Sequence, residues 1–557
     1  MKTGKVFAAL ALAFLLAGCA ACPARDKMSG NPKPVKNVIF LLTDGTGPEA
    51  WPLARWIKGS PLAVDEILTG AVRTYGADSI ITDSAPGATA YATGRKGSDK
   101  GISVAPWHIT IAAADADPAL KYIPLATILE GARLSGRATG LVATSNIQHA
   151  TPAAFSAHWH DRSDYNELGE QQVYQNIDVV LGGGKQYLLP RELAGGKRED
   201  KEDLINVLKS MGYDFVETRD QMLAAKSGKL WGAFAPDAMA YDIDRAATAP
   251  TEPGLSEMTA KAIDLLAASP KSPKAGFFLF VEGSKIDWAA HANDPSGLAY
   301  DLLAFDAAVK TSLDFAKKDG NTLVIVVSDH GTGGITIGTK EDKNYSLTDD
   351  DSVVVPMRKV KLTGEGIDKL IAGEASETKI RNIITDNWGI TDLSAEEIAA
   401  ITETVAKKKA LNAVLGPMLS RRARLGWTTG GHTGADVFLF SYGPGRPAGL
   451  MENTAIGTCM ASAMGFDFGS LNRKLYVEAG EAFAALGCQA TIDKHDPANP
   501  VILVRKGDAA ATIPLAKNQI RVNGKALSFN GIAVLAEKLE KAYLPEEAVE
   551  MTAAEMN

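Results

Sequence analysis

The sequence lacks an excess of positive charge. Its 557 residues include 66 acidic and 58 basic side chains, so the net charge is −8. This balance gives no basic field of the kind that draws a protein onto nucleic-acid phosphates, so any anion must be held by a local site. We expect no nucleic-acid partner. With 46% hydrophobic and 22% charged residues, the chain should be globular and bury one large core, or a large and a small one.

Beyond the leader the sequence also lacks internal repeats and low-complexity segments. The leader itself has Lys2 and Lys5 before the apolar run VFAALALAFLLAG, which is too short to span a bilayer comfortably and has the layout of a secretory signal. The run ends in LAGC, which resembles the bacterial lipobox. We expect a signal peptide over 1–18, a tether over 19–36, and a lipid anchor on Cys19 that holds the exported protein in the periplasm or on the cell surface. An ordinary cleaved signal is the alternative.

Cysteine is scarce, with four in the chain. Cys19 and Cys22 lie in the leader. Cys459 and Cys488 could pair in an oxidising compartment, but their separation in space does not follow from the sequence. A disulfide between them therefore stays open.

What the chain does have is a series of continuous apolar runs: NVIFLLTDG, RATGLVATS, IDVVLGGG, AGFFLFVEG, NTLVIVVSDHG and ADVFLFSYG. Runs of this kind are typical of strands buried on both faces, and helical patterns such as EMTAKAIDLLAAS separate them. The alternation predicts an α/β fold with a doubly wound, mostly parallel sheet flanked by helices. Polar residues at the carboxyl ends of such strands tend to line the site. We place Asp44, Asp178, Glu282, Asp329 and His330 at those ends.

Two stretches interrupt the pattern, and we interpret both as surface insertions: residues 195–253 and the largely helical segment between SDHG and GGHTG. We assign 37–470 to the catalytic domain and 471–557 to a small α+β module of unknown role. In this module VILVRKGD and ATIPLAKNQIRVNGKALSF predict short strands with a hairpin turn at Asn523-Gly524, and GIAVLAEKLEKAYL predicts a final helix.

Three short segments pair carboxylates with histidines. In VEGSKIDWAAHAND, Asp287 and His291 are four residues apart, which places both on one face of a helical turn, a common geometry for two ligands of one metal. Alone the pair indicates little, because it is more often a surface contact. SDHG adds Asp329 and His330, and GGHTGAD adds His432 in a glycine-rich loop. The chain has only eight histidines, so three in these segments together favour a metal centre.

The segment TDSAPGATAYATG predicts a helix that begins at Ser84. Pro86 fits the first turn, where a missing N–H is not needed, and the helix N-terminus carries partial positive charge. The next histidine along the chain, His108, lies far outside this segment, so a nucleophilic Ser84 needs another means of losing its proton. The alternative is that Ser84 only caps the helix.

These motifs resemble the alkaline phosphatase family. TDGTG, TDSAPGATAYATG, HATPAAFSAHWHDR, VEGSKIDWAAH, SDHG and GHTGADV follow in the family's order, from about residue 37 to about residue 466. The leader and the C-terminal module lie outside the resemblance. It implies metal-dependent hydrolysis of phosphate monoesters at alkaline pH through a phosphoserine intermediate.

The resemblance also implies two zinc ions and a third metal, usually magnesium. It assigns the first zinc to Asp287, His291 and His432, the second to Asp44, Asp329 and His330, and the third metal to Asp44, Thr151 and Glu282. The metals would replace a base for Ser84, because a bound cation lowers the pKa of a coordinated oxygen. Arg162 matches the arginine that binds phosphate, and its planar fork suits two oxygens at once.

Two positions depart from one branch of the family. Where some members carry Asp and Lys, this chain has His149 and Trp288. We expect the loss of a carboxylate to weaken magnesium binding at the third site, where an imidazole could favour zinc instead. Trp288 removes a positive charge near the phosphate, so product should leave more readily.

Other interpretations remain at this point. A phosphodiesterase or phosphomutase would keep the ligands of two metals but should not need Thr151 and Glu282. A sulfatase is weaker, because DSAPGAT lacks the Pro and Arg pattern of its nucleophile motif. A non-enzymatic, metal-holding lipoprotein is the third alternative. We expect a homodimer to be possible, His158 and His160 to lie near the site without binding metal, and the remaining two histidines, His108 and His495, to be surface residues.

Overall fold

The computed structural model describes residues 34–114, 116–226, 228–340, 342–373 and 376–556. The predicted signal peptide, Cys19, Cys22 and most of the tether lie outside these residues. The fold is that of the unit formed by residues 35–557.

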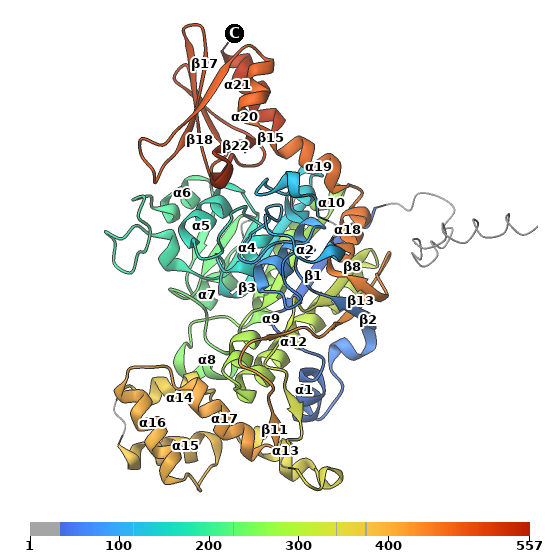
Figure 1. Cartoon of the computed structure of the whole chain (residues 1–557), viewed down its shortest axis with the longest axis vertical. Coiled ribbons are helices and arrows are strands. Elements are labelled where there is room, and N and C mark those ends of the chain that lie inside the picture. Colours follow the sequence, from blue (N-terminus) through green and yellow to red (C-terminus); the bar gives the residue numbers. More distant parts are fainter. Residues whose placement is uncertain (1–33, 115, 227, 341, 374–375, 557) are drawn as a thin grey trace, which may run out of the picture. The chain divides into compact units, whose positions relative to one another are not determined.

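A mostly parallel central sheet organises the catalytic region (Figure 1). Ten described strands form it in the order β14-β2-β13-β8-β1-β7-β3-β4-β6-β5. All neighbours are parallel except β13, which runs antiparallel to β2 and β8. Their bounds are β1 Asn37–Thr43, β2 Leu68–Arg73, β3 Ala138–Asn146, β4 Val179–Gly183, β5 Asp214–Val216, β6 Leu230–Ala233, β7 Phe277–Gly283, β8 Thr322–Val327, β13 Val437–Tyr442 and β14 Gly449–Glu452. The doubly wound α/β prediction is confirmed.

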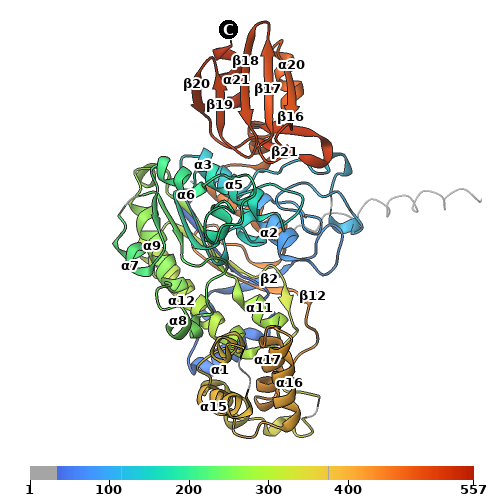
Figure 2. The ribbon, with the colours of Figure 1, turned by 90° about the vertical axis from the view of Figure 1, so that its left-hand side faces the viewer.

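Strand β1 shows why the sheet is covered on both faces. All seven of its residues are buried, and successive side chains enter different cores: Ile39 and Leu41 pack in one, Phe40 and Leu42 in the other. The helices follow the same division (Figure 2). The first core receives α1 Ala50–Lys58, α9 Leu255–Ala268, α11 Lys285–His291 and α12 Pro295–Asp319, and the second receives α2 Ser84–Thr93, α3 Ile128–Leu134, α4 Ala150–Ala154, α5 Tyr165–Tyr174, α6 Leu204–Ser210 and α18 Asn453–Met464.

The first predicted insertion, residues 195–253, is more than a surface excursion. It contains α6, α7 Arg219–Ala224 and α8 Asp242–Thr248, and also the strands β5 and β6, which extend the central sheet at one edge. The interpretation as a surface insertion was therefore wrong for these strands. They are three and four residues long and lie in a polar segment, so no long apolar run indicated them.

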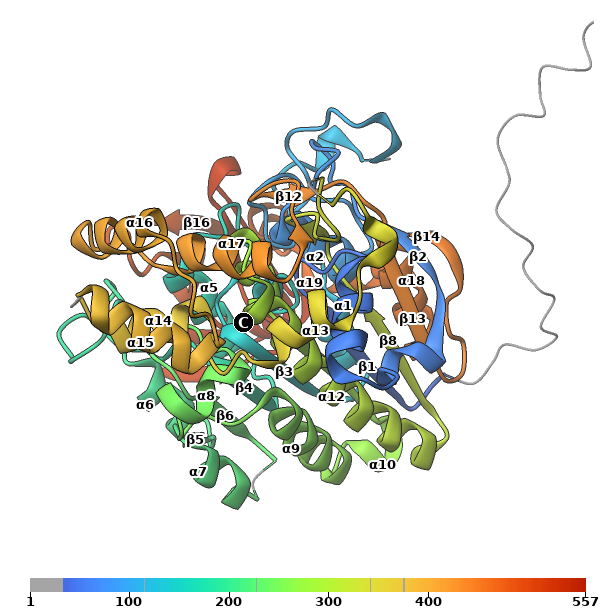
Figure 3. The same cartoon turned by 90° about the horizontal axis from the view of Figure 1, so that it is seen from below.

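The second insertion is helical, as expected (Figure 3). Its helices are α13 Asp350–Arg358, α14 Gly364–Ile371, α15 Glu377–Trp388, α16 Ala395–Ala406 and α17 Asn412–Arg422. Two short ladders close it, one of β9 Gly331–Thr332 with β12 His432–Thr433 and one of β10 Thr336–Ile337 with β11 Leu425–Gly426. It contacts helix α11, which carries the predicted ligands Asp287 and His291, through an ion pair in which the buried Lys285 Nζ lies 3.0 Å from Glu365 Oε2. The insertion thus packs directly on an element of the site.

The C-terminal module is built from two antiparallel sheets and three helices. Five strands pair in sequence order, β16 Gln489–Asp493, β17 Val501–Lys506, β18 Ala509–Pro514, β19 Gln519–Val522 and β20 Lys525–Ser528. The Asn523-Gly524 turn is confirmed, and both residues have positive φ, as a tight hairpin between right-twisted strands requires. The other elements are β15 Val477–Glu478, β21 Val534–Ala536, β22 Lys541–Leu544, α19 Phe468–Leu475, α20 Ala479–Ala485 and α21 Glu546–Glu555.

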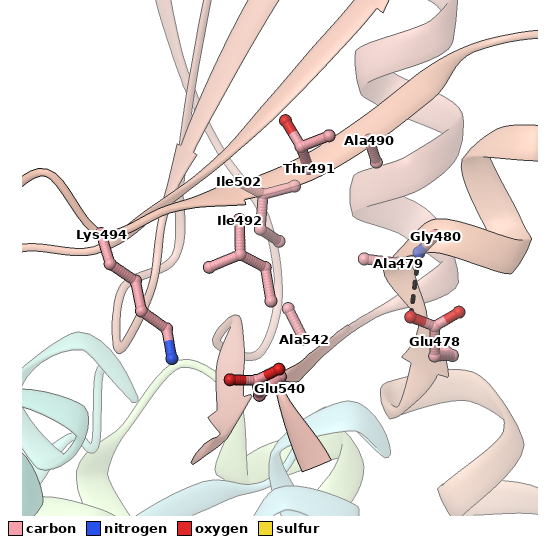
Figure 4. A pocket seen from close by; sticks show the side chains of 10 residues that line it. All are labelled: Glu478, Ala479, Gly480, Ala490, Thr491, Ile492, Lys494, Ile502, Glu540 and Ala542. Atoms are coloured by element: carbon pink, nitrogen blue, oxygen red, sulfur yellow. Dashed lines mark hydrogen bonds between the residues drawn. The ribbon is translucent and has the colours of Figure 1, made fainter. Parts of the chain in front are cut away.

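The helix predicted from GIAVLAEKLEKAYL was wrong. This segment forms the β21–β22 hairpin, Glu540 takes a positive φ in its turn, and β15 pairs with β22. Partners distant in sequence override the local helical pattern, and the final helix is α21, which begins two residues later. A hollow of about 440 Å³ lies in the module and has Lys494, Glu478 and Glu540 in its lining (Figure 4).

Three further findings bear on the sequence analysis. Cys459 and Cys488 are both free thiols, so the disulfide left open above does not form in this structure. Among the described helices, none combines the length and the apolar character needed to cross a bilayer. The module contacts the catalytic region through hydrogen bonds and ion pairs. In one of these hydrogen bonds the Ala126 amide donates to Asn472 Oδ1 at 2.8 Å.

Candidate metal centre and active site

The carboxyl ends of three adjacent strands meet at one edge of the sheet. Asp44 follows β1 directly, Glu282 lies near the end of β7 and pairs in register with Leu42 of β1, and Asp329 and His330 follow β8. All four side chains are fully buried. Parallel pairing therefore brings together residues that lie hundreds of positions apart in the chain.

Asp178 does not belong to this edge, and its assignment to a strand end was wrong. It precedes β4 and so lies at the amino end of that strand. Its carboxylate pairs with Lys271 Nζ at 2.8 Å and accepts a hydrogen bond from the Thr139 amide at 2.9 Å. In IDVVLGGG the acid opens the apolar run instead of closing it, which is the signal that separates it from the others.

Helix α2 places Ser84 against these strand ends. It begins at Ser84 with Asp83 as N-cap, and all ten of its residues are buried. Small side chains allow this close approach: a Cβ added at Gly87 would lie only 3.2 Å from Asp329 Cβ. Ser84 Oγ lies 3.2 Å from His330 Nε2. The predicted nucleophile is thus in direct contact with a predicted metal ligand, in the first turn of a helix as the sequence indicated.

The first ligand group consists of Asp287, His291 and His432. Helix α11 presents Asp287 and His291 on one face, with His291 Nε2 3.3 Å from Asp287 Oδ2, and the β12 residue His432 brings its Nε2 to 3.1 Å from that of His291. Each histidine has its Nδ1 at a backbone carbonyl, of Gly430 at 2.8 Å and of Thr82 at 2.9 Å. Such contacts fix Nδ1 as the protonated nitrogen and leave the Nε2 lone pair for a metal.

The second ligand group consists of Asp44, Asp329 and His330. His330 Nε2 lies 3.3 Å from Asp329 Oδ2 and 3.6 Å from Asp44 Oδ1. Burial, followed by the negative charge of Asp329, raises the pKa of Asp44 well above its ordinary value. Burial also raises the pKa of Asp329 to about 7. Among the described residues, neither Asp44 nor Asp329 pairs with a lysine or arginine.

A third group lies behind the second. Ligand atoms of Asp44, His149 and Glu282 come within 4.8 Å of one another. Both carboxylate oxygens of Asp44 and of Glu282, together with Thr151 Oγ1 and His149 Nδ1, are buried and have no hydrogen-bond partner among the described residues. Burial raises the pKa of Glu282 to about 8. The buried oxygen atoms and the imidazole nitrogen are in place to bind a cation.

Arg162 reaches the same site from the loop after α4. Its Nη1 donates to Asp83 Oδ2 at 2.5 Å, and its Nη2 lies 3.1 Å from His149 Nε2. Burial disfavours the charged guanidinium, but the Asp83 carboxylate outweighs this effect and raises the pKa of Arg162. Burial and then the Arg162 charge lower the pKa of His149 to about 3, so its imidazole is neutral. The ring of Trp288 packs edge-on against His149 at 5.6 Å.

Cations fit these groups on chemical grounds. Burying several carboxylates without lysine or arginine costs free energy unless they are protonated or bind metal. The first two groups combine imidazole nitrogen with carboxylate oxygen, a donor set typical of zinc. The third offers mainly oxygen atoms, which suit magnesium, plus the His149 nitrogen, which suits zinc.

The structure also identifies two contacts that sequence analysis missed. Asp83 holds Arg162 through the hydrogen bond from Nη1 to Oδ2. Thr332 Oγ1 donates to Asp287 Oδ1 at 2.6 Å and lies 3.2 Å from His330 Nδ1, so it connects the first two ligand groups. An aspartate beside a serine and a threonine in a glycine-rich loop are common residues, and the sequence offers no signal that distinguishes them.

The remaining histidines lie apart from the ligand groups. His158 is fully buried in a network in which its Nε2 lies 2.6 Å from the Tyr476 hydroxyl and 3.3 Å from Glu130 Oε1. His160 Nε2 lies 3.5 Å from Glu537 Oε2 of the C-terminal module. His108 and His495 are exposed, as expected.

Comparison with known proteins gives a family for this chain. The family model described as alkaline phosphatase matches residues 35–466. Alkaline phosphatase 3 of Bacillus subtilis (strain 168) is 35% identical over 463 residues, which cover 80% of this chain and 92% of that protein. The repressible alkaline phosphatase of Saccharomyces cerevisiae is 33% identical over 472 residues, which cover 76% of this chain and 80% of that protein.

Solved structures agree. The alkaline phosphatase of Thermus thermophilus superposes with a TM-score of 0.69 at 26% identity, covering 79% of this chain and 93% of that one. A cold-active alkaline phosphatase from Shewanella sp. gives 0.65 at 29% identity, covering 77% and 99%. A mutant of the TAB5 alkaline phosphatase with Mg bound in its M3 site gives 0.55 at 27% identity, covering 78% and 99%. The family match ends at residue 466, just before α19.

Proposed function

The chain belongs to the alkaline phosphatase family of phosphomonoesterases, and from this premise we propose that Ser84 is the nucleophile and carries a phosphoserine intermediate. The observation that supports this most directly is the position of Ser84 Oγ, 3.2 Å from His330 Nε2 at the first turn of α2. The reaction is the metal-dependent hydrolysis of a phosphate monoester to an alcohol and inorganic phosphate.

We propose zinc for the first two ligand groups and magnesium for the third. Zinc competes with magnesium at the third group, because zinc prefers a nitrogen donor such as His149. When bound, these cations supply Lewis-acid stabilisation and lower the pKa of oxygen atoms that they contact. Buried oxygen atoms support the third site, since the carboxylates of Asp44 and Glu282 and the Thr151 hydroxyl have no hydrogen-bond partner among the described residues. The same set favours a monoesterase over a phosphodiesterase on this scaffold.

Ser84, Arg162 and the N-terminus of α2 each act directly on the phosphoryl group. Ser84 Oγ attacks phosphorus in line and the alcohol leaves on the opposite side, after which water hydrolyses the phosphoserine. Arg162 binds two non-bridging oxygens of the phosphoryl group, and Asp83 orients its guanidinium through a charge-assisted hydrogen bond. The α2 N-terminus adds partial positive charge beside the phosphoryl group.

Replacing Ser84 with alanine tests the assignment. We expect Ser84→Ala to remove most turnover of p-nitrophenyl phosphate while zinc and magnesium contents stay near those of the parent protein, because the ligands are unchanged. The parent should prefer p-nitrophenyl phosphate to bis-p-nitrophenyl phosphate and lose activity with a chelator. Full activity of Ser84→Ala would show that another group is the nucleophile, and a preference for the bis-ester would favour a phosphodiesterase.

We further propose that the mature protein is lipid-anchored on Cys19 and faces the periplasm or the cell surface. LAGC after an apolar run supports this. Cys19→Ser should move the protein from the detergent phase to the aqueous phase or leave it unprocessed. If mass spectrometry of membrane-extracted protein finds no lipid on Cys19, the anchor is excluded and the signal is an ordinary cleaved one. Homodimer formation is a separate proposal, which sedimentation of the solubilised enzyme tests.

A further inference from the structure

A hollow of about 310 Å³ opens beside the proposed nucleophile. Thr82, Asp83 and Pro86, which flank Ser84 in the chain, form part of its wall, and His432 of the first ligand group forms another part. His432 in turn stacks on His330, with ring centroids 3.7 Å apart. A phosphoryl group bound at Ser84 therefore borders this hollow, and the alcohol esterified to it has space there.

The charged side chains that line the hollow are aspartates. Asp78, Asp83 and Asp99 contribute carboxylates from different turns of the chain, whereas no lysine or arginine is among the described lining residues. Asp83 is already paired with Arg162, so Asp78 and Asp99 carry the charge that a substrate would meet. The Asp99 amide donates to Asp78 Oδ2 at 3.0 Å, which holds the two residues together.

Nearby cations leave this charge largely uncompensated. His108 Nδ1 lies 3.9 Å from Asp78 Oδ2, but its side chain is 66% exposed and the contact is screened by water. Lys100 follows Asp99 and is exposed. Burial, followed by the charges of Asp83 and Asp78, raises the pKa of Asp99 despite the opposing charge of Lys100, so the three carboxylates lie within electrostatic reach of one another.

The same hollow has an apolar wall. Ile81 lines it with 48% of its surface exposed, and the neighbouring Ile80 is 71% exposed. Two large aliphatic side chains left in water beside a carboxylate pair match a ligand that carries both hydrocarbon and positive charge. An alkylammonium group meets both conditions.

We propose that Asp78 and Asp99 select phosphate monoesters of cationic alcohols, namely amino alcohols and quaternary ammonium alcohols. The inference rests on the proposed function, because it assumes that the ester is cleaved at Ser84. The alcohol occupies the hollow with its hydrocarbon against Ile81 and its ammonium group toward the two carboxylates.

Two monoesters of nearly equal shape test the role of charge. Choline phosphate and 3,3-dimethylbutyl phosphate differ in a single atom, a quaternary nitrogen in place of a carbon. We expect kcat/KM to favour choline phosphate by roughly three- to tenfold at low ionic strength, and the preference to shrink as salt is added. Because an ammonium group also acidifies the leaving alcohol, the decisive quantity is how this ratio changes between variants.

Asp78→Asn and Asp99→Asn should each lower the ratio, and the double variant should bring it to the value set by leaving-group acidity alone. Asparagine at 78 can still accept the Asp99 amide hydrogen, so the loop keeps its contact. Asp220→Asn is the matched control, since the Asp220 side chain is 93% exposed and lies outside the hollow. It should leave the ratio unchanged.

The outcomes separate the two proposals. If the parent protein hydrolyses p-nitrophenyl phosphate but the ratio is the same in the parent and in the double variant, the cationic selectivity is overturned and the proposed function stands. If no monoester is hydrolysed by the metal-loaded parent, the proposed function fails and this inference with it. A ratio that falls equally in Asp220→Asn would assign the effect to overall charge and overturn the role of the hollow.

Discussion

Two clusters of carboxylates in this protein have similar composition and opposite surroundings. Asp44, Asp329 and Glu282 converge at the sheet edge without a lysine or arginine partner among the described residues. Glu170 and Glu202, which lie close to Asp200, are instead held by cations of the chain itself. The first cluster therefore needs cations from solution when its carboxyl groups are ionised, whereas the second has cations of the chain beside it.

The compensating charges of the second cluster come from two directions. Arg198 Nη2 lies 3.2 Å from Glu170 Oε2 and also pairs with Asp200. Lys517, from the C-terminal module, lies 3.1 Å from Glu170 Oε1 and 2.8 Å from Glu202 Oε2. Proximity of three acids alone does not indicate a metal site; the absence of a protein cation beside buried acids does.

Neutralising one acid in each cluster tests whether the two clusters differ in their need for added cations. Asp329→Asn should lower kcat/KM for p-nitrophenyl phosphate by on the order of 100- to 1,000-fold, because it removes a charged ligand beside Ser84. Glu202→Gln, with the same change of charge in the compensated cluster, should stay within about twofold of the parent. Metal content measured on both variants should fall only in the first. Equal activity losses would show that the two clusters do not differ in the proposed way.

Proton release on metal binding gives a second test of the first cluster. In the metal-free protein burial raises the pKa of Glu282 to about 8 and of Asp329 to about 7, so both are largely protonated below these values. Metal binds the deprotonated forms, so affinity should rise with pH up to about 8, by as much as about tenfold per pH unit for each proton released, and then level off.

The stability of the metal-free protein changes with pH in the opposite direction to its metal affinity: it falls as pH rises. A carboxyl group whose folded pKa is raised contributes stability below its unfolded pKa and loses it as pH rises through the folded value. The increase in Tm on adding zinc should thus grow between about pH 5 and pH 8. Calorimetric titrations in buffers of different protonation enthalpy measure the released protons. A pH-independent affinity would mean that the first cluster is ionised without metal.

How much of the fold and of the candidate site could be predicted from the sequence depends on how far apart in the chain the interacting residues lie. Long apolar runs such as β1 indicate the central sheet on their own, because strands buried on both faces need continuous hydrophobic sequence. The candidate site residues that the structure brings together were accessible through the family's motifs. Short elements were not: β5 and β6 lack such runs, and the β21–β22 hairpin depends on its pairing with β15.

The second cluster shows the limit most clearly. Nothing in the sequence near Glu170 or Glu202 points to Lys517, which lies more than 300 residues away from either and belongs to a module outside the family match. The Tyr476 hydroxyl contacts Glu130 and His158 in the same way. Such pairs follow from the packing of the module against the catalytic region, which local patterns do not encode.

The smallest expected effect concerns stability and comes from removing Lys517. Its side chain is 13% exposed and those of Glu170 and Glu202 are 7% and 18% exposed, so Lys517→Ala leaves Glu170 with Arg198 alone in a poorly hydrated place. Breaking a fully buried pair costs about 3–5 kcal/mol; partial exposure reduces the expected loss to about 1–3 kcal/mol in urea unfolding.

Lys525→Ala is the matched control, because the ion pair of Lys525 with Glu555 lies in the same module and its lysine side chain is 61% exposed. It should cost no more than about 1 kcal/mol. Neutralising the acid left behind, in Lys517→Ala combined with Glu170→Gln, should recover part of the loss, since the cost arises from a buried carboxylate without its partner. The rate of p-nitrophenyl phosphate hydrolysis per active site should stay near that of the parent in all three proteins. Equal losses in Lys517→Ala and Lys525→Ala would show that Lys517 is only a surface charge and that the second cluster is compensated by Arg198 alone.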